Sequence, residues 1–179
     1  MNIRLSAFVA ISLDGYIARL NNSLDWLETE YKTDHSEDYG YKKYISSVDC
    51  IVMGRNTFEK VVSFPEWAYQ NRRVIVLSKQ WKQIPDQFAK LAELYTGTIE
   101  LLTVELQNQG VRHVYVDGGI TIQSAIQNKI LNDICITTVP VLLGKGIRLF
   151  GNVRDDIELE LLNTTSFASG FVQSRYRFK

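Results

Sequence analysis

Runs of apolar, mostly β-branched residues alternate with polar or helix-periodic segments along most of the chain. A run that is apolar at every position predicts a strand covered on both faces, because a half-exposed strand alternates apolar and polar side chains. Strands are expected at 3–12, 49–53, 73–77, 98–101 and 114–116. Helices are expected at 36–46, 58–62, 85–94, before Gly110 and after Gly119. This alternation predicts one α/β domain over residues 1–179 with a mostly parallel sheet.

The last third of the chain has a different pattern. Strand-like runs at 133–143, 157–165 and 171–178 follow one another without a convincing long helix between them. Strands joined without a crossover helix usually pair in antiparallel fashion. The sheet is therefore expected to be mixed, with antiparallel strands at its C-terminal edge and helices on both faces.

A very tight turn, Asp117-Gly118-Gly119, joins the apolar run 114–116 to the helical pattern that follows. Glycine can adopt positive φ and lets the backbone come close to a ligand, and the N–H groups at the start of a helix bind phosphate. This interpretation predicts a nucleotide site. The alternative is that both glycines only permit the turn, since neither a G-x-G-x-x-G nor a Walker sequence is present.

Two other strand ends carry residues suited to phosphate. Gly54-Arg55-Asn56-Thr57 follows the strand at 49–53, and Ser78-Lys79 follows the strand at 73–77. Arg55 and Lys79 offer positive charge, whereas Thr57 and Ser78 offer hydroxyl donors. Each alone is more often a solvated surface residue, but ligands bind outside the carboxyl ends of strands in open α/β sheets. Together they predict a site for a dinucleotide with an additional phosphate.

Composition limits the partners. Twenty basic residues balance twenty acidic ones, so no overall field attracts nucleic acid or an anionic membrane, and small partners are expected. Cys50 and Cys135 lie in apolar runs, which favours buried free thiols and a reducing compartment such as the cytoplasm. No apolar run reaches the ~18 residues of a membrane span. His35 and His113 lack neighbours with zinc-ligand spacing, so no metal site is expected.

Four motifs together resemble a known family. They are Ser12-Leu13-Asp14-Gly15-Tyr16-Ile17-Ala18, Met53-Gly54-Arg55-Asn56-Thr57-Phe58, Val116-Asp117-Gly118-Gly119 and Val139-Pro140-Val141-Leu142-Leu143-Gly144-Lys145-Gly146-Ile147-Arg148-Leu149-Phe150. In this order they resemble the dihydrofolate-reductase-like superfamily. Within it, the chain is most similar to the reductase domain of the riboflavin-biosynthesis deaminase/reductase. True dihydrofolate reductases have three consecutive glycines where this chain has Asp117-Gly118-Gly119, which separates it from the folate branch.

The resemblance implies a dihydrofolate-reductase-like three-layer fold and an NADPH-dependent reductase of a small heterocycle, most like the phosphoribosylaminouracil reductase of riboflavin biosynthesis. Alternatives are a dihydrofolate- or pterin-reductase-like activity, or a member that binds the cofactor without turnover. Carried over by position, the nicotinamide would lie beside Ala10, Ile17 and Ala18. The phosphates would be held by Gly54, Arg55, Thr57, Ser78, Lys79, Gly118, Gly119, Ile120 and Thr121, with Ser78 and Lys79 at the 2′-phosphate.

The resemblance gives candidates, rather than one residue, for the proton donor, and it also implies an oligomeric state. Counted back without gaps from Gly54, Asp38 falls where the folate enzymes have their active-site carboxylate, and burial beside Trp26 and Tyr41 would raise its pKa. The alternative is an acid that stabilises a helix N-terminus. Asp14 and Thr137 are further catalytic candidates, although Asp14 could only shape its turn and Thr137 could only hydrogen-bond within its strand. Relatives are commonly dimers, so a homodimer is expected, with the apolar strand near 139–143 at its edge.

Overall fold

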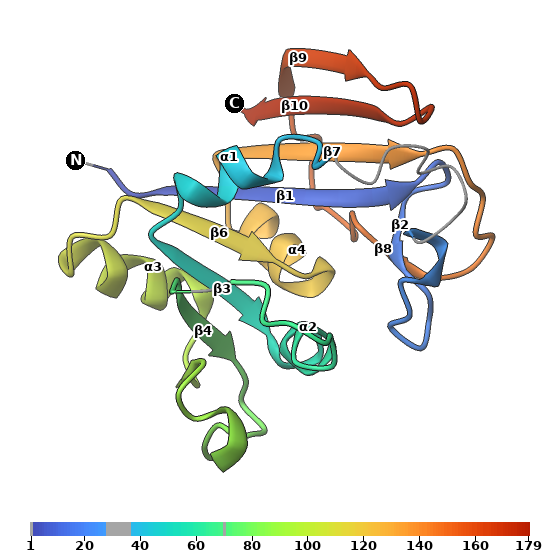
Figure 1. Cartoon of the computed structure of the whole chain (residues 1–179). Helices are drawn as coiled ribbons and strands as arrows, with labels where there is room; N and C mark the ends of the chain where they lie inside the picture. The colour runs from blue at the N-terminus through green and yellow to red at the C-terminus, as the bar shows by residue number, and fades with distance from the viewer. Residues whose placement is uncertain (1, 28–36, 70) are drawn as a thin grey trace.

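The computed structural model describes residues 2–27, 37–69 and 71–179. Its centre is an eight-stranded sheet (Figure 1), parallel from β5 to β7 and antiparallel at β10 and β9. In spatial order the strands are β5 (Glu93–Tyr95), β4 (Arg73–Leu77), β3 (Cys50–Gly54), β6 (His113–Asp117), β1 (Arg4–Ser12), β7 (Asp133–Val139), β10 (Val172–Phe178) and β9 (Leu159–Ser166). The predicted mixed sheet with an antiparallel C-terminal edge is confirmed.

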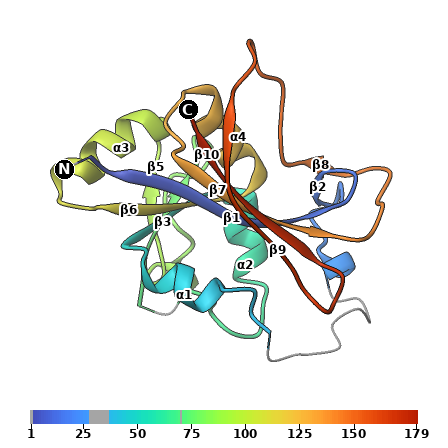
Figure 2. The ribbon, with the colours of Figure 1, turned by 90° about the horizontal axis from the view of Figure 1, so that it is seen from above.

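The helices form the outer layers. They are α1 (Tyr41–Ser46), α2 (Arg55–Val61), α3 (Ile99–Asn108) and α4 (Gly119–Gln127), with single 3₁₀ turns at Asp25–Leu27 and Asp86–Phe88. Seen from above, α3 and α4 lie on one side of the strands and α1 and α2 on the other (Figure 2). A two-stranded antiparallel sheet, β2 (Tyr16–Ala18) and β8 (Ile147–Arg148), lies beyond the carboxyl end of β1 (Figure 1).

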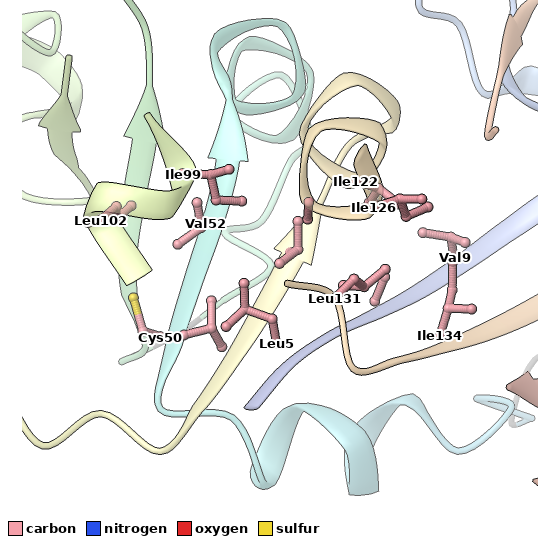
Figure 3. Packing of buried hydrophobic residues seen from close by; sticks show 14 of the residues in the cluster. Leu5, Val9, Cys50, Val52, Ile99, Leu102, Ile122, Ile126, Leu131 and Ile134 are labelled. Atoms are coloured by element: carbon pink, nitrogen blue, oxygen red, sulfur yellow. The ribbon is translucent and has the colours of Figure 1, made fainter. Parts of the chain in front are cut away.

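Alternate residues of each strand enter different cores, which explains the continuous apolar runs. Leu5 of β1 and Val52 of β3 pack with Ile122 of α4 on the α3/α4 face (Figure 3). Ile51 and Met53 of β3 point to the opposite face and pack with residues of α1 and α2. Leu5 is only 2% exposed, so Leu5→Ala is expected to cost about 2–5 kcal/mol of folding free energy.

Strand register brings the motifs to one edge. Met53 of β3 lies opposite Asp117 of β6, and Gly54 lies opposite Leu77 of β4. Because these strands are parallel, the residues that follow them, the starts of α2 and α4 and the segment 78–79, emerge at the same edge of the sheet. The predicted convergence of the three strand ends is therefore confirmed.

Two predicted elements between β4 and α3 are wrong. The segment 85–94 is not a helix: a single 3₁₀ turn is followed by β5, whose Glu93 pairs with Ile75 and whose carboxylate binds Arg73. The segment 98–101 is not a strand, because Thr98 is the N-cap of α3 and its Oγ1 accepts the Leu101 N–H. Strand pairing and helix capping override the local pattern here.

Two predicted boundaries also change. The helix expected at 36–46 begins only at Tyr41, after a turn in which Tyr39 and Gly40 have positive φ, and Ser36 lies outside the described residues. The strand expected at 133–143 ends at Val139. Pro140 follows it and has no N–H to continue the ladder.

Cys50 and Cys135 are both buried and free, as expected. Among the described residues, no helix is long and apolar enough to cross a membrane. In the same part of the chain, no three His, Cys, Asp or Glu side chains are grouped as a metal site would need.

Candidate active site

A cleft of about 980 Å³ opens at the carboxyl edge of the sheet. It is lined from β2, the starts of α2 and α4, the segment after β4 and the start of α3. All residues assigned to the cofactor from the sequence line this cleft except Ala10: Ile17, Ala18, Gly54, Arg55, Thr57, Ser78, Lys79, Gly118, Gly119, Ile120 and Thr121. The structure thus brings these residues together, while their individual roles stay predictions.

Glycine is required where the two helix starts meet. Gly118 has a φ of 87°, and a Cβ atom there would lie 2.1 Å from Thr57 Oγ1. A Cβ at Gly54 would lie 3.2 Å from Thr121 Oγ1. The turn itself therefore demands glycine at position 118, with or without a ligand in the cleft. The same two glycines also let α2 and α4 begin side by side at the cleft.

Gly119 behaves differently from its neighbour. Its φ is not in the positive range, but a Cβ atom there would lie 3.2 Å from Ile17 Cγ2 of β2. The first backbone bond at this end of α4 runs from the Ile122 N–H to the Gly118 carbonyl, 2.9 Å long. The N–H groups of the first helical residues therefore have no intrahelical partner and are suited to an anion.

Positive charge lies beside these helix starts. Within the described part of the chain, the Arg55 guanidinium makes a 3.2 Å contact to its neighbour Asn56 and a 4.0 Å ion pair with Glu59. Lys79 is exposed at the cleft edge. Ser78 Oγ accepts the N–H groups of Gln80 and Trp81, both at 3.2 Å, so it shapes the turn that presents Lys79. Positive charge and helix starts at one place would favour an anionic group.

Asp117 is a site residue that the sequence analysis treated only as part of the turn. Its side chain lines the cleft and accepts hydrogen bonds from the Tyr69 hydroxyl at 2.6 Å and the Gly118 N–H at 2.7 Å. Burial is the largest influence on this carboxyl and raises its pKa, although the Tyr69 and Gly118 bonds oppose the rise. An acid with a raised pKa in a cleft can deliver a proton at higher pH than a solvated one.

Three tyrosines surround this carboxyl: Tyr41 from α1, Tyr69 from the segment after α2, and Tyr115 two residues earlier in β6. Burial and the nearby Asp117 raise the pKa of all three phenols. They are therefore neutral hydrogen-bond donors; the Tyr115 hydroxyl donates to the Phe8 carbonyl at 3.0 Å. This part of the cleft is aromatic and has one carboxyl group at its centre.

The three catalytic candidates named from the sequence lie elsewhere. Asp38 does not line the cleft, and the expected rise in its pKa is wrong, because hydrogen bonds from the Lys42 and Gly40 N–H groups lower it. Asp38 instead caps the start of α1, as the alternative interpretation has it. Thr137 is buried in β7, where its Oγ1 accepts a 2.9 Å bond from Gln173.

The Asp14 carboxylate links two loops through hydrogen bonds. It accepts hydrogen bonds from Ser12 Oγ at 2.6 Å, the Leu143 N–H at 3.1 Å and the Gly144 N–H at 2.7 Å. The Ser12 hydroxyl is the largest of the influences that lower its pKa. Asp14 therefore stays ionised and holds the segment after β7 against the β1–β2 turn.

Comparison with solved structures supports the fold. A protein of Shewanella sp. PV-4, provisionally described as a riboflavin biosynthesis protein, is 32% identical and superposes with a TM-score of 0.92 over 99% of each chain. A diaminohydroxyphosphoribosylaminopyrimidine deaminase/5-amino-6-(5-phosphoribosylamino)uracil reductase from Thermotoga maritima is 15% identical, with a TM-score of 0.73 over 99% of this chain and 57% of that one. The fold is thus that of the dihydrofolate-reductase-like reductases.

Sequence comparison agrees. The protein YwjB of Bacillus subtilis (strain 168) is 29% identical over 171 residues, which cover 94% of each chain. The family model of the RibD C-terminal domain matches residues 4–173. The chain therefore belongs to the RibD C-terminal domain family, as its motifs indicate.

Proposed function

We propose that this protein is an NADPH-dependent reductase of a small nitrogen heterocycle. The observation that carries the proposal is the cleft itself, where the starts of α2 and α4, the cations Arg55 and Lys79 and the half-buried Asp117 lie at a single edge of the sheet. The residues fit a phosphorylated dinucleotide. Gly118 leaves no space for a side chain beside Thr57, and α4 offers unpaired N–H groups.

NADPH, when bound, supplies the hydride. The chain's own residues would hold and orient it: the start of α4 at the pyrophosphate, Arg55 and Lys79 at the 2′-phosphate, and Ile17 and Ala18 beside the nicotinamide. At the end of β4 the described chain carries Ser78 and Lys79, while the carboxylate of Glu100 lines the cleft from the first turn of α3. This arrangement favours NADPH over NADH.

Reduction of a C=N or C=O group also requires a proton. A general acid must lie within hydrogen-bond reach of the reacting atom or reach it through one water. Among the described residues, the acids that line the cleft are Asp117 and Glu100; Asp117 lies next to the neutral tyrosines, and burial raises its pKa. Asp117 therefore takes the place that the sequence analysis gave to Asp38.

Two further functions are considered, a narrower reductase activity and an alternative without turnover. One is phosphoribosylaminouracil reduction, the activity of the Thermotoga enzyme, which shares the fold of this chain at 15% identity. The second candidate is a protein that binds NADPH without turnover, since the cofactor part of the cleft would serve either purpose.

The test is a two-stage titration. Quenching of tryptophan fluorescence by NADPH and by NADH measures binding, and the proposal expects saturable binding with a clear preference for NADPH. Oxidation of NADPH, followed by absorbance with pyrimidine and pterin substrates, then measures turnover. Saturable NADPH binding without oxidation by any substrate of the panel would favour the second candidate. Absence of NADPH binding to folded protein would refute both.

A further inference from the structure

A chain of hydrogen-bonded polar side chains lies at the opposite end of β6 from Asp117. Ser6 of β1 is 0% exposed and His113 of β6 is 7% exposed. Ser6 Oγ lies 2.7 Å from His113 Nε2 and 2.8 Å from the hydroxyl of Tyr44 in α1. His113 Nδ1 lies 2.9 Å from the carbonyl oxygen of Ser47, the C-cap of α1. The chain therefore starts on α1, crosses two strands and returns to the end of the same helix.

The direction of each bond follows from the group at its end. A carbonyl oxygen can only accept, so the proton that His113 directs at Ser47 is on Nδ1. Ser47 Oγ, 3.2 Å from the same nitrogen, uses its own proton on the Tyr44 carbonyl at 2.7 Å. In neutral His113, Nε2 then accepts the Ser6 proton, and the Ser6 oxygen accepts from the Tyr44 hydroxyl. Each proton of the chain has its own acceptor.

Charged groups face His113 from the neighbouring elements. Asp133 of β7 and Asp49 before β3 favour a charged imidazole, whereas Arg4 of β1 disfavours it. The Asp133 carboxylate is also shared between Arg4 and Arg175, at 2.7 and 2.9 Å. The pKa of His113 is nevertheless lowered, because burial of the ring is the largest influence. At neutral pH the ring is therefore uncharged, as the chain of bonds requires.

Protonation of His113 is incompatible with this chain. A proton on Nε2 would face the Ser6 oxygen, which would have to accept it. The Ser6 proton would turn toward the Tyr44 oxygen, and the Tyr44 hydroxyl would lose its acceptor. Tyr44 is largely shielded from water, which is the main reason why its pKa is raised. A donor left without a partner in such surroundings is costly, so a charged His113 weakens the attachment of α1.

The position of α1 matters because of Tyr41. The helix has only six residues, none of them fully buried, and so short a helix depends on its contacts for stability. The Tyr44 ring packs against Phe8 and Tyr115, with ring centres 4.9 and 5.2 Å apart. Tyr41 contacts Phe8 at 5.7 Å and lines the cleft, where Asp117 influences its pKa. Whatever fixes Tyr44 therefore also fixes the aromatic wall beside the proposed proton donor.

We propose that Ser6 and His113 clamp α1 to the sheet and thereby position Tyr41 in the cleft. Protonation of His113 opens this clamp. The inference rests on the proposed reductase function and adds to it two positioning residues that are not among the described residues lining the cleft. An open clamp would let water reach Asp117 and weaken the burial that raises the pKa of this carboxyl.

The experiment places 3-fluorotyrosine at position 41 of the whole chain, where its ¹⁹F NMR signal reports the surroundings of this ring. Ser6→Ala and Tyr44→Phe each remove a hydroxyl of the clamp, and Tyr44→Phe keeps the packing of the ring. Ser46→Ala is the matched control, because the Ser46 hydroxyl bonds only to the Lys43 carbonyl within α1. We expect the signal to move by more than its line width in both clamp variants and to stay in place in the control.

Thermal unfolding is measured on the same samples. A lower Tm with an unmoved signal in Tyr44→Phe would make the chain of bonds purely structural and overturn the inference. Tyr44→Phe decides the outcome if Ser6→Ala does not fold. A signal that moves equally in Ser46→Ala would also overturn it, because any lost hydroxyl on α1 would then have the same effect.

The acid arm is run in Asp117→Asn, so that this carboxyl cannot titrate beside the label. Below the ordinary histidine pKa of about 6.5, the signal should move toward its position in Ser6→Ala. With His113→Gln added, which has no titrating ring, the signal should stay constant over the same range; an identical titration would overturn the role of His113. NADP binding to the native protein is measured separately. Its failure would refute the proposed function, whereas normal binding with an unmoved label in the clamp variants would refute only the clamp.

Discussion

The Tyr69 hydroxyl donates a 2.6 Å hydrogen bond to Asp117 Oδ2 across 48 positions of sequence. Tyr69 is 4% exposed and belongs to the core on the α1/α2 face, whereas Asp117 ends β6 and lines the cleft. The bond therefore fixes the carboxyl from the core side and favours its ionised form, against the burial that favours the protonated form. Tyr69 is in this sense a positioning residue for the proposed proton donor.

The first prediction concerns this bond. Tyr69→Phe removes the donor that stabilises the carboxylate, so the pKa of Asp117 should rise further. The protonated acid would then persist to higher pH, and the alkaline limb of the kcat profile should move upward. Tyr95→Phe is the matched control, because the Tyr95 hydroxyl also donates to a carboxylate, that of Glu105, but away from the cleft. An unmoved alkaline limb in Tyr69→Phe would separate Tyr69 from proton transfer.

The second prediction tests Asp117 itself. Asp117→Asn keeps the shape of the side chain and an oxygen for the Tyr69 hydroxyl, but it cannot release a proton. We expect kcat to fall about 10²- to 10⁴-fold, the usual contribution of a general acid, with unchanged NADPH affinity. Burial raises the pKa of Asp117 in the folded state, so this group favours folding at low pH and loses that contribution as pH rises through its folded pKa. At neutral pH the variant avoids this cost but replaces one of the two oxygens that accept from Tyr69 and Gly118 by an NH2 group, so its Tm should stay close to the native value.

The glycine turn and the cations could be predicted from the sequence because each is a local pattern of strand, glycine and helix start. The Tyr69–Asp117 bond could not, since it joins residues that only the folded sheet brings together. The prediction that Asp38 lies in the active site was wrong because a count without gaps does not allow for the longer loop before α1. The predicted helix at 85–94 and the predicted strand at 98–101 were wrong for a related reason. Short segments take the structure that their partners impose: β4 pairs with β5, and the first turn of α3 is capped by Thr98.

The third prediction concerns cofactor choice. Arg55→Glu combined with Lys79→Glu reverses both charges beside the predicted 2′-phosphate, where charge-assisted hydrogen bonds contribute about 1.5–3 kcal/mol each. The preference for NADPH over NADH, measured as a ratio of dissociation constants, should fall at least tenfold. Lys90→Glu, an exposed change outside the cleft, controls for net charge. An unchanged ratio in the double variant would place the 2′-phosphate elsewhere.

The fourth prediction separates Asp14 from Asp117. Asp14→Asn weakens the bonds that Ser12, Leu143 and Gly144 donate to the carboxylate, so the Tm at neutral pH should fall while kcat of the folded protein is retained. The lowered pKa means that this stabilisation exists above the ordinary carboxyl pKa of about 3.9 and is lost as pH falls through the lower folded value. The Tm difference should therefore shrink in acid. A large loss of kcat with native Tm would return Asp14 to the candidate proton donors.

The last prediction is assembly. All eight residues of the edge strand β9 are exposed, and an uncovered edge invites pairing with another chain. Leu161 lies opposite Tyr176 and Leu159 opposite Phe178, and opposed residues point to the same face, so both leucines lie on the face that α4 covers further along the sheet. Leu159 is 36% exposed and Leu161 56%. In the segment 139–143, which the sequence analysis expected at the interface, the strand ends at Val139; Val139 is fully buried, whereas Leu142 is 70% exposed.

We therefore expect a homodimer that pairs through the β9–β10 hairpin rather than through 139–143, since an apolar patch on a sheet edge is the usual place for a second copy. Leu161→Glu should convert it to a monomer in light scattering at micromolar concentration, because the charge would have to be buried without a partner. Leu101→Glu, on the exposed side of α3 at 58% exposure, tests whether any new surface charge has this effect. A monomeric mass for the native protein would refute the dimer, and a dimer that survives Leu161→Glu would move the interface away from β9.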